Sequence, residues 1–448
     1  MAHTVIIGNG IAGTSCARHL RKLSDDPITI ISSESEHFFS RTALMYVYMG
    51  HMRFQDIKPY EDWFWTKNRL SLRKGYVEQV DIERKELLLH GGEVVSYDRL
   101  VLALGSKPNK FGWPGQDLKG VQGLYSKQDL ELLEENTDPY GSEQRVKRAV
   151  IIGGGLIGIE LAEMLLTRGI PVTFLVRETH FWGNVLPKEE SQIVMRHMRE
   201  HHVDLRLETE LKEILSDDQG RVRAVNTKGG ETIDCQFVGL TAGVSPNIDF
   251  LKDSVIETDR GVLVDRGMQT NVPDVYAIGD CAQFKDPVPG RRPIEQVWYT
   301  GRMMGETLAR TLAGESSEYR PGHWFNSAKF FDIEYQTYGW VFPQAREGEK
   351  HFYWEHPDGK KSIRLNYRSD SGQFVGVNSF GIRLRHEIFD RWLNDERDIE
   401  HVVTHMRDAN FDPEFYEGFE QELLDAFNLQ NGTSLKVKKR SLKRIFNL

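Results

Sequence analysis

Two segments of the chain share one pattern, in which a short apolar run is followed by closely spaced glycines. Residues 4–13 are TVIIGNGIAG, and residues 149–158, which begin 145 positions later, are AVIIGGGLIG. The β-branched run predicts a buried parallel strand, the GxGxxG glycines predict a tight turn, and the residues beyond them predict a helix. The repeat therefore predicts two βαβ units in one chain.

The two helices are expected over 11–23 and 156–168, and Gly169 followed by Pro171 marks the end of the second. Turn-rich residues over 135–147 predict a linker between the two units. Further apolar runs predict strands at 28–32, 100–104, 172–176, 237–240 and 275–278.

The pattern changes after about residue 319. Short aromatic runs replace the alternation of glycine turns and helices: FFDIEYQTYGWVF, KHFYWEH, SIRLNY and FVGVNSFG. They predict antiparallel strands, and charged amphipathic stretches from about His386 predict helices. We therefore expect a third, α+β domain.

Composition narrows the class of protein. The 448 residues are 39% hydrophobic and 27% charged, and no apolar run approaches the roughly 18 residues of a membrane span. The N-terminus lacks the pattern of a secretory signal. The net charge of −9 argues against nucleic-acid binding. The three cysteines, Cys16, Cys235 and Cys281, are far apart, which fits a reducing compartment and predicts a cytoplasmic protein.

A strand, a GxGxxG turn and a helix together predict a dinucleotide site. The first glycine permits the turn, the second lets the backbone approach a pyrophosphate, and the third lets helix and strand pack closely. The helix N-terminus adds free N–H groups and a partial positive charge. Two such sites in one chain indicate electron transfer from a nicotinamide to a flavin.

A later strand, VYAIGD over 275–280, ends at a carboxylate suited to binding a sugar-like hydroxyl chain. Its alternative role is that of a helix N-cap. Together with this strand, GNGIAG, LALGS, GGGLIGIE and LTAGVSPN stand in an order that resembles the FAD-dependent pyridine nucleotide oxidoreductases. The five motifs span roughly residues 4–310.

The absence of a CxxC or CxxxxC pair argues against the disulfide reductases of that superfamily. Residues 38–45, FFSRTALM, and residues 325–339, FNSAKFFDIEYQTYG, resemble instead the branch of rubredoxin, ferredoxin and nitrite reductases, which includes the apoptosis-inducing-factor group. The resemblance implies an α/β fold with two Rossmann-like domains, for FAD and NAD(P), and a C-terminal α+β domain. The implied ranges are 1–135 with 253–318 for FAD, 136–252 for NAD(P)H, 319–430 for the α+β domain and 431–448 for a basic tail.

The resemblance also implies site residues. Those expected at FAD are Gly8, Gly10, Ile11, Ala12, Gly13, Glu34, Arg41, Ala103, Gly105, Gly279 and Asp280. Those expected at the nicotinamide dinucleotide are Gly153, Gly155, Leu156, Ile157, Gly158, Glu160, Glu178 and Gly243. Trp298 is expected beside the isoalloxazine, and the residues expected at the reacting rings are Glu160, Tyr46 and Trp298.

Two positions depart from the family pattern. Related reductases have a lysine that pairs with the glutamate near the flavin, whereas this chain has Tyr46 at that position, so Glu160 lacks its usual cation. Glu160 as a plain helix-surface carboxylate stays an alternative. Glu34 lies one residue beyond the usual acidic position, which Ser33 occupies.

The choice of coenzyme depends on the end of the strand at 172–176. A carboxylate there accepts hydrogen bonds from a ribose 2′-hydroxyl, and an arginine pairs with a 2′-phosphate. The chain offers both, as Arg177 and Glu178. We favour NADH through Glu178, because no further basic cluster lies nearby.

The expected function is that of an NAD(P)H-dependent oxidoreductase whose FAD passes electrons to a small redox protein such as rubredoxin or ferredoxin. Two alternatives stay open: a peripheral membrane NADH:quinone reductase, and a redox-sensing interaction protein of the apoptosis-inducing-factor type. A homodimer contact through the C-terminal domain is a further open expectation.

Three further features each have a structural and a functional interpretation. The last fifteen residues hold six basic residues and no acid, which predicts either a solvated tail or a basic arm for an acidic partner or anionic membrane. His197, His201 and His202 predict a solvated helix end, and no metal site is expected. Cys281 predicts an inert buried thiol rather than a redox group.

Overall fold

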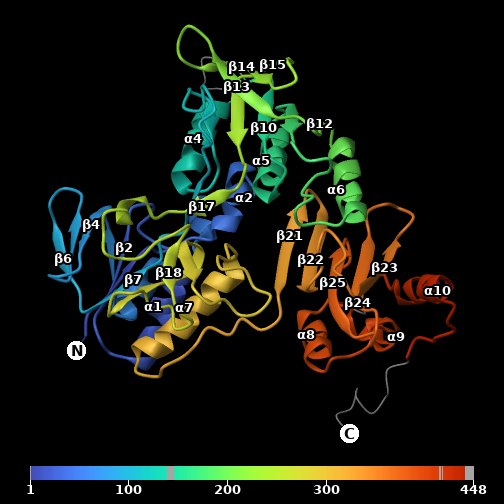
Figure 1. Ribbon diagram of the computed structural model, residues 1–448. Coiled ribbons are helices and arrows are strands. Elements are labelled where there is room, and N and C mark those ends of the chain that lie inside the picture. The colour runs from blue at the N-terminus through green and yellow to red at the C-terminus, as the bar shows by residue number, and fades with distance from the viewer. Residues whose placement is uncertain (1, 139–145, 413–414, 416, 439–448) are drawn as a thin grey trace. The chain divides into compact units, whose positions relative to one another are not determined.

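The computed structural model describes residues 2–138, 146–412, 415 and 417–438 (Figure 1). The chain divides into two compact units, each of which is described by itself. The larger unit holds Met1–Gly153, Leu161–Val172 and Leu211–Pro321, and the smaller unit holds Gly154–Glu160, Thr173–Glu210 and Gly322–Leu448. Among the described residues, none of the helices combines the length and the apolar character needed to span a bilayer.

A five-stranded parallel sheet forms the centre of the larger unit. Four of its strands are largely buried and consist mainly of β-branched and leucine residues, whereas the edge strand β3 buries only Leu70. Their order across the sheet is β19 (Val275–Ala277), β7 (Arg99–Leu102), β1 (Thr4–Ile7), β2 (Ile28–Ser32) and β3 (Leu70–Lys74). The predicted strands at 28–32, 100–104 and 275–278 are thus confirmed, with the second and third ending earlier than expected.

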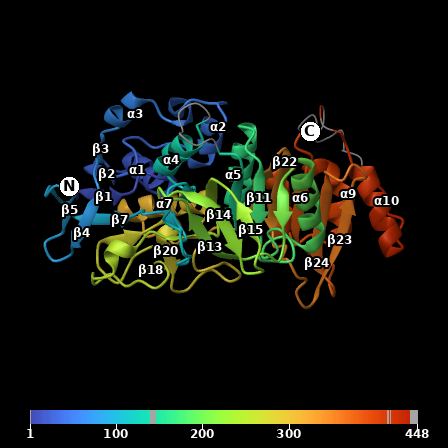
Figure 2. The ribbon, with the colours of Figure 1, turned by 90° about the horizontal axis from the view of Figure 1, so that it is seen from above.

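Two helices of the larger unit pack closely against each other. They are α1 (Ile11–Leu23), whose predicted bounds are confirmed, and α7 (Trp298–Leu312). Figure 2 shows α1 and α7 beside the strands of the parallel sheet. A Cβ on Gly305 would lie 2.9 Å from the Cys16 nitrogen and closer still to the Ala12 carbonyl oxygen, so only glycine permits this contact.

The second GxGxxG segment lies in a second parallel arrangement. In the larger unit, β10 (Ala149–Ile152) and β9 (Val121–Gln122) pair with β16 (Phe237–Leu240). β11 (Val172–Leu175) pairs with β12 (Asp204–Arg206) through Thr173, Phe174 and Leu175, which belong to the smaller unit. The helix α5 runs over Leu156–Thr167, and Gly169 beyond it has a φ of +69°, which confirms the predicted helix and its stop.

The remaining elements of the larger unit are short. Two antiparallel sheets consist of β4 (Val77–Asp81), β5 (Glu86–Leu89) and β6 (Val94–Ser96), and of β13 (Leu211–Ser216), β14 (Val222–Thr227) and β15 (Thr232–Asp234). Two-stranded pairs join β8 (Ser106–Pro108) to β17 (Val244–Pro246) and β18 (Val262–Val264) to β20 (Ala282–Phe284). The helices are α2 (Leu44–Tyr48), α3 (Asp62–Lys67) and α4 (Lys127–Thr137), with the 3-10 turns Arg41–Ala43, Phe54–Ile57, Asp249–Leu251 and Gly279–Cys281.

The smaller unit contains the predicted antiparallel sheet. Its strands follow the order β21 (Phe325–Phe330), β22 (Ile333–Gly339), β25 (Phe374–Phe380), β24 (Ser362–Arg368) and β23 (Glu349–Glu355). The helices α8 (His386–Asn394), α9 (Ile399–Ala409) and α10 (Glu420–Asn431) share one apolar core with this sheet. Figure 1 shows α6 (Lys188–Glu200) near these strands as well.

The expected fold class is therefore confirmed: two parallel, Rossmann-like arrangements and an antiparallel α+β part. The domain ranges given above stay a prediction. Part of the expected linker, 139–145, and the end of the basic tail, 439–448, lie outside the described residues.

Candidate functional site

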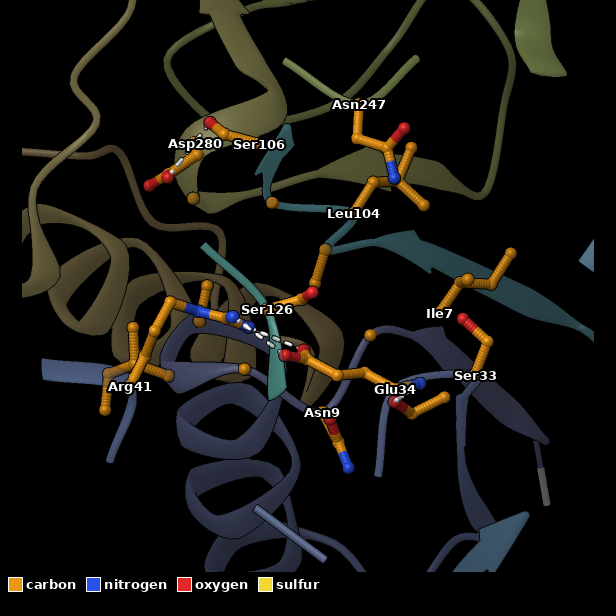
Figure 3. A pocket seen from close by; sticks show the side chains of 18 of the residues that line it. Ile7, Asn9, Ser33, Glu34, Arg41, Leu104, Ser106, Ser126, Asn247 and Asp280 are labelled. Carbon is orange, nitrogen blue, oxygen red and sulfur yellow. Dashed lines mark hydrogen bonds and ion pairs between the residues drawn. The ribbon is translucent and has the colours of Figure 1, made fainter. Parts of the chain in front are cut away.

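A pocket of about 660 Å³ opens in the larger unit. Its walls come from the turn after β1, the ends of β2, β7 and β19, the residues before α4 and the start of α7. Figure 3 shows side chains from several of these segments around the pocket, among them Asn9, Glu34, Leu104, Ser126 and Asp280. The pocket thus lies at the carboxyl ends of parallel strands, where open α/β sheets bind their ligands.

The first glycine turn forms one wall of the pocket, and its backbone lies close to that of Ala103. Gly8 has a φ of +113°, and a Cβ on it would lie 2.8 Å from the Ala103 carbonyl carbon. A Cβ on Gly13 would meet the Gly8 carbonyl oxygen, so these two glycines serve the packing of turn, helix and sheet.

Gly10 is different, since a Cβ there would meet no protein atom within 4 Å. Gly10 lines the pocket and is the N-cap of α1, with no side-chain cap and no acidic residue in the first turn of the helix. The N–H groups of that turn are therefore available to an anion, as a dinucleotide pyrophosphate requires.

Glu34 and Arg41 both line the pocket and form an ion pair (Figure 3). The Arg41 guanidinium donates to the two carboxylate oxygens over 2.8 and 2.6 Å and lies 4.4 Å from the centre of the Tyr125 ring. The Lys127 backbone N–H donates to Glu34 over 2.9 Å. Ser33 also lines the pocket, so both candidate positions for the ribose contact reach it.

Asp280 stands at the centre of a hydrogen-bond network. Its Oδ2 accepts from the Ser106 hydroxyl over 3.1 Å and from the Tyr125 hydroxyl over 3.2 Å, and Gln296 donates to Ser106 over 2.7 Å. Burial raises the pKa of Asp280, against the opposing effects of these hydrogen bonds and of Arg41. The carboxylate is thus held in place toward the pocket.

The sequence did not reveal Ser106, Tyr125 or Gln296 as members of this network. Ser106 stands inside the LALGS motif, which is the one signal that could have indicated it. Tyr125 and Gln296 reach Asp280 and Ser106 through the fold, from positions 155 and 190 residues apart from their partners.

The residues expected at the reacting rings have different surroundings. Trp298 lines the pocket at the start of α7. Tyr46, on α2, is not among the lining residues, and its ring lies 6.2 Å from that of His51. Glu160 is half-buried on α5. Of the other expected FAD residues, Ile11, Ala12, Ala103, Gly105 and Gly279 line the pocket.

The residues expected at the nicotinamide dinucleotide follow the second glycine turn. Gly153 has a φ of +117°, and a Cβ on it would lie 2.8 Å from the Thr241 carbonyl oxygen. Gly155, like Gly10, has no atom within 4 Å of a built Cβ. Leu156, Ile157 and Gly158 form the first turn of α5, and Gly243 has a φ of +86°.

The end of β11 carries both candidate coenzyme-selecting side chains. Arg177 donates to the Glu178 carboxylate over 2.8 Å, so the two charges compensate each other. Three quarters of the Arg177 side chain is exposed, against 38% for Glu178. Both groups are thus accessible from solvent at the end of this strand.

Comparison with known proteins agrees with this geometry. Residues 2–305 match the family described as pyridine nucleotide-disulphide oxidoreductase. This chain belongs to the pyridine nucleotide-disulphide oxidoreductase family. The expectation of an oxidoreductase that uses FAD and NAD(P)H is confirmed at the level of this family.

Three similar proteins place the chain within the family. The nitrite reductase [NAD(P)H] of Bacillus subtilis is 30% identical over 84% of this chain, which spans 45% of that protein. The rubredoxin-NAD(+) reductase of Acinetobacter baylyi is 30% identical over 70% of this chain and 79% of its own length. A ferredoxin reductase structure from Rhodopseudomonas palustris covers 95% of this chain and 100% of its own, with a TM-score of 0.77 and 22% identity.

This member of the family has no redox-active disulfide among its cysteines. Cys16, Cys235 and Cys281 are buried and unpaired, and burial raises the pKa of each thiol to about 12. The Cys281 thiol donates to the carbonyl oxygens of Leu102 and Ile278 over 3.4 Å. A buried thiol of high pKa is unreactive, which agrees with the expected inert role of Cys281.

Proposed function

We propose that the chain passes electrons from NAD(P)H through FAD to a small one-electron redox protein. One observation carries the proposal: the pocket joins an uncapped helix N-terminus to the held carboxylate of Asp280, in a chain without a cysteine pair. FAD, when bound, accepts two electrons together and releases them singly. The relative from Acinetobacter baylyi is named for rubredoxin and a relative from Sphingomonas for ferredoxin, which supports this choice.

The residues of the pocket fit the parts of FAD. The first turn of α1 at Gly10 would receive the pyrophosphate, and Glu34 or Ser33 would accept hydrogen bonds from the adenosine ribose. Asp280, held by Ser106 and Tyr125, would accept from the ribityl hydroxyls. Trp298 would lie beside the isoalloxazine and shield it from water.

The second glycine turn would hold the nicotinamide dinucleotide, with Gly155 open to its pyrophosphate. We propose NADH as the preferred coenzyme, because Glu178 would accept from the ribose 2′-hydroxyl and would repel a 2′-phosphate. Arg177, already paired with Glu178, would be less available to a phosphate. Hydride transfer between two rings needs little acid–base chemistry. The residues that bind the coenzyme would therefore contribute by aligning its ring with the flavin.

The acceptor is tested with the flavin-loaded full chain. The protein is reduced with NADH without oxygen and mixed in separate experiments with rubredoxin, a [2Fe–2S] ferredoxin, a quinone in vesicles, and a low-molecular-weight disulfide. Reoxidation by an iron protein at least about tenfold faster than by the disulfide supports the proposal. Fastest reoxidation by the quinone supports the membrane alternative, and slow reoxidation by every acceptor overturns the reductase assignment. The proposed cytoplasmic location and homodimer rest on the sequence arguments alone.

A further inference from the structure

The C-terminal half of α6 carries His197, and His201 follows as the C-cap residue of the helix. His197 and His201 are four residues apart, and helical residues at this spacing are neighbours. The turn between β21 and β22 brings Asp332 to the same place, although it is 135 residues from His197 in the sequence. All of these residues belong to the smaller unit.

The three side chains point their ligand atoms toward one another. Asp332 Oδ1 lies 2.5 Å from His197 Nε2 and 3.2 Å from His201 Nε2, and the three atoms lie within 4.8 Å of one another. The expected solvated helix end is wrong for His197, whose exposed fraction is 2%. A buried imidazole needs partners for its ring nitrogens, and His197 has them in this cluster.

Neighbouring side chains fix both rings. The His201 ring stacks on Phe331 at 4.3 Å with an interplanar angle of 6°, and His197 meets the same ring edge-on at 5.9 Å. Glu200 Oε2 lies 3.2 Å from His197 Nδ1. A histidine that binds a metal through one nitrogen typically donates its other N–H to a carboxylate, which orients the ring. Glu200 is placed to do this for His197.

We propose that His197, His201 and Asp332 form a binding site for a divalent transition metal, with Zn²⁺ as the best fit. Two imidazoles and one carboxylate suit Zn²⁺ and disfavour Mg²⁺ and Ca²⁺, which prefer oxygen ligands alone. Three protein ligands leave a fourth tetrahedral position for water. The bound ion would connect α6 to the turn between β21 and β22.

Metal binding requires a small movement of one side chain. Ligand atoms around tetrahedral Zn²⁺ are about 3.4 Å apart, given bonds of about 2.1 Å. Asp332 would therefore have to withdraw from His197 by about 1 Å. Its side chain is 65% exposed and stands in a turn, so it has the freedom to do so, while the buried His197 stays in place.

The test is a calorimetric titration of the untagged, chelator-treated full chain with ZnCl₂ and, separately, MgCl₂. The proposal predicts one Zn²⁺ per chain with a micromolar or lower Kd, a rise in Tm with Zn²⁺, and no Mg²⁺ binding. Asp332→Asn and His201→Ala should each weaken Zn²⁺ binding at least about tenfold, and Glu200→Gln by about 10- to 100-fold.

The matched control is His202→Asn. His202 is exposed, adjoins His201 and lies outside the cluster, and asparagine tolerates its φ of +61°. This variant should bind Zn²⁺ like the wild type. Equal Zn²⁺ binding by the wild type, Asp332→Asn and His201→Ala would overturn the proposal, as would the absence of Zn²⁺ binding by the wild type. Either result would leave the His–Asp contacts as hydrogen bonds that join α6 to the sheet.

Discussion

Alanine substitutions at Gly8 and Gly10 distinguish a glycine that the fold requires from a glycine that the cofactor requires. A Cβ on Gly8 would lie 2.8 Å from the Ala103 carbonyl carbon at a φ of +113°, whereas a Cβ on Gly10 would meet no protein atom within 4 Å at a φ of −68°. If a pyrophosphate occupies the space beside Gly10, Gly10→Ala collides with the cofactor rather than with the protein.

The expected magnitudes differ accordingly. Gly8→Ala combines backbone strain of about 1–3 kcal/mol with overpacking of about 1–3 kcal/mol, so the protein without cofactor loses about 2–6 kcal/mol of unfolding free energy. Gly10→Ala changes that free energy by less than about 1 kcal/mol, because the reduced entropy of the unfolded chain offsets a poorer N-cap. Its affinity for FAD should fall at least tenfold, which corresponds to about 1.4 kcal/mol.

The assay is denaturant unfolding of the flavin-free proteins, followed by FAD titration with fluorescence detection. Gly229→Ala is the control, since Gly229 is exposed in the turn between β14 and β15, and a Cβ there would come no nearer than 3.7 Å to the Thr227 hydroxyl. It should leave both stability and affinity unchanged. Unaltered FAD affinity in Gly10→Ala would refute the placement of the pyrophosphate at α1.

Other predictions concern helix packing, the buried carboxylate, the thiols and the coenzyme. Gly305→Val should lower Tm by several degrees, because its side chain would enter the Ala12 backbone; an unchanged Tm contradicts the close packing of α1 and α7. Because the pKa of Asp280 is raised in the folded state, its contribution to the stability of the cofactor-free protein is present at acid pH and is lost as pH rises through that pKa. Asp280→Asn should therefore raise the Tm more at pH 7 than at pH 4 and should weaken FAD binding; a pH-independent effect on Tm would contradict the burial argument. Cys281 should resist alkylation in the folded protein at pH 8, since its thiol pKa is about 12, and rapid labelling would contradict its burial. Glu178→Gln should reduce the preference for NADH over NADPH in stopped-flow flavin reduction at least about fivefold, and an unchanged ratio would remove Glu178 from coenzyme selection.

The sequence alone predicted the helices and strands that are determined by residues close together in the chain. The β-branched runs and glycine turns predicted β1, α1, α5 and β16 because strand propensity, turn geometry and helix stops act over a few residues. The same turns identified Gly8 and Gly10, although their different roles became visible only from the atoms around them.

Contacts between distant segments could not be predicted in this way. The Tyr125 hydroxyl reaches Asp280 across 155 positions, and Asp332 reaches His197 across 135. Neither pair has a local pattern, since each depends on how strands and helices pack. For the same reason, the spacing of His197 and His201 indicated a helix face but not that one of these rings is buried.

The proposed function requires that the pocket of the larger unit hold a flavin that NADH reduces. Its most direct test is the absorption spectrum of the purified full chain, recorded after loading with FAD and again during anaerobic titration with NADH. If the pocket holds FAD, the spectrum should show about one flavin per chain, and about one equivalent of NADH should bleach the flavin band. A protein that stays colourless after loading, or a bound flavin that NADH does not bleach, would contradict it.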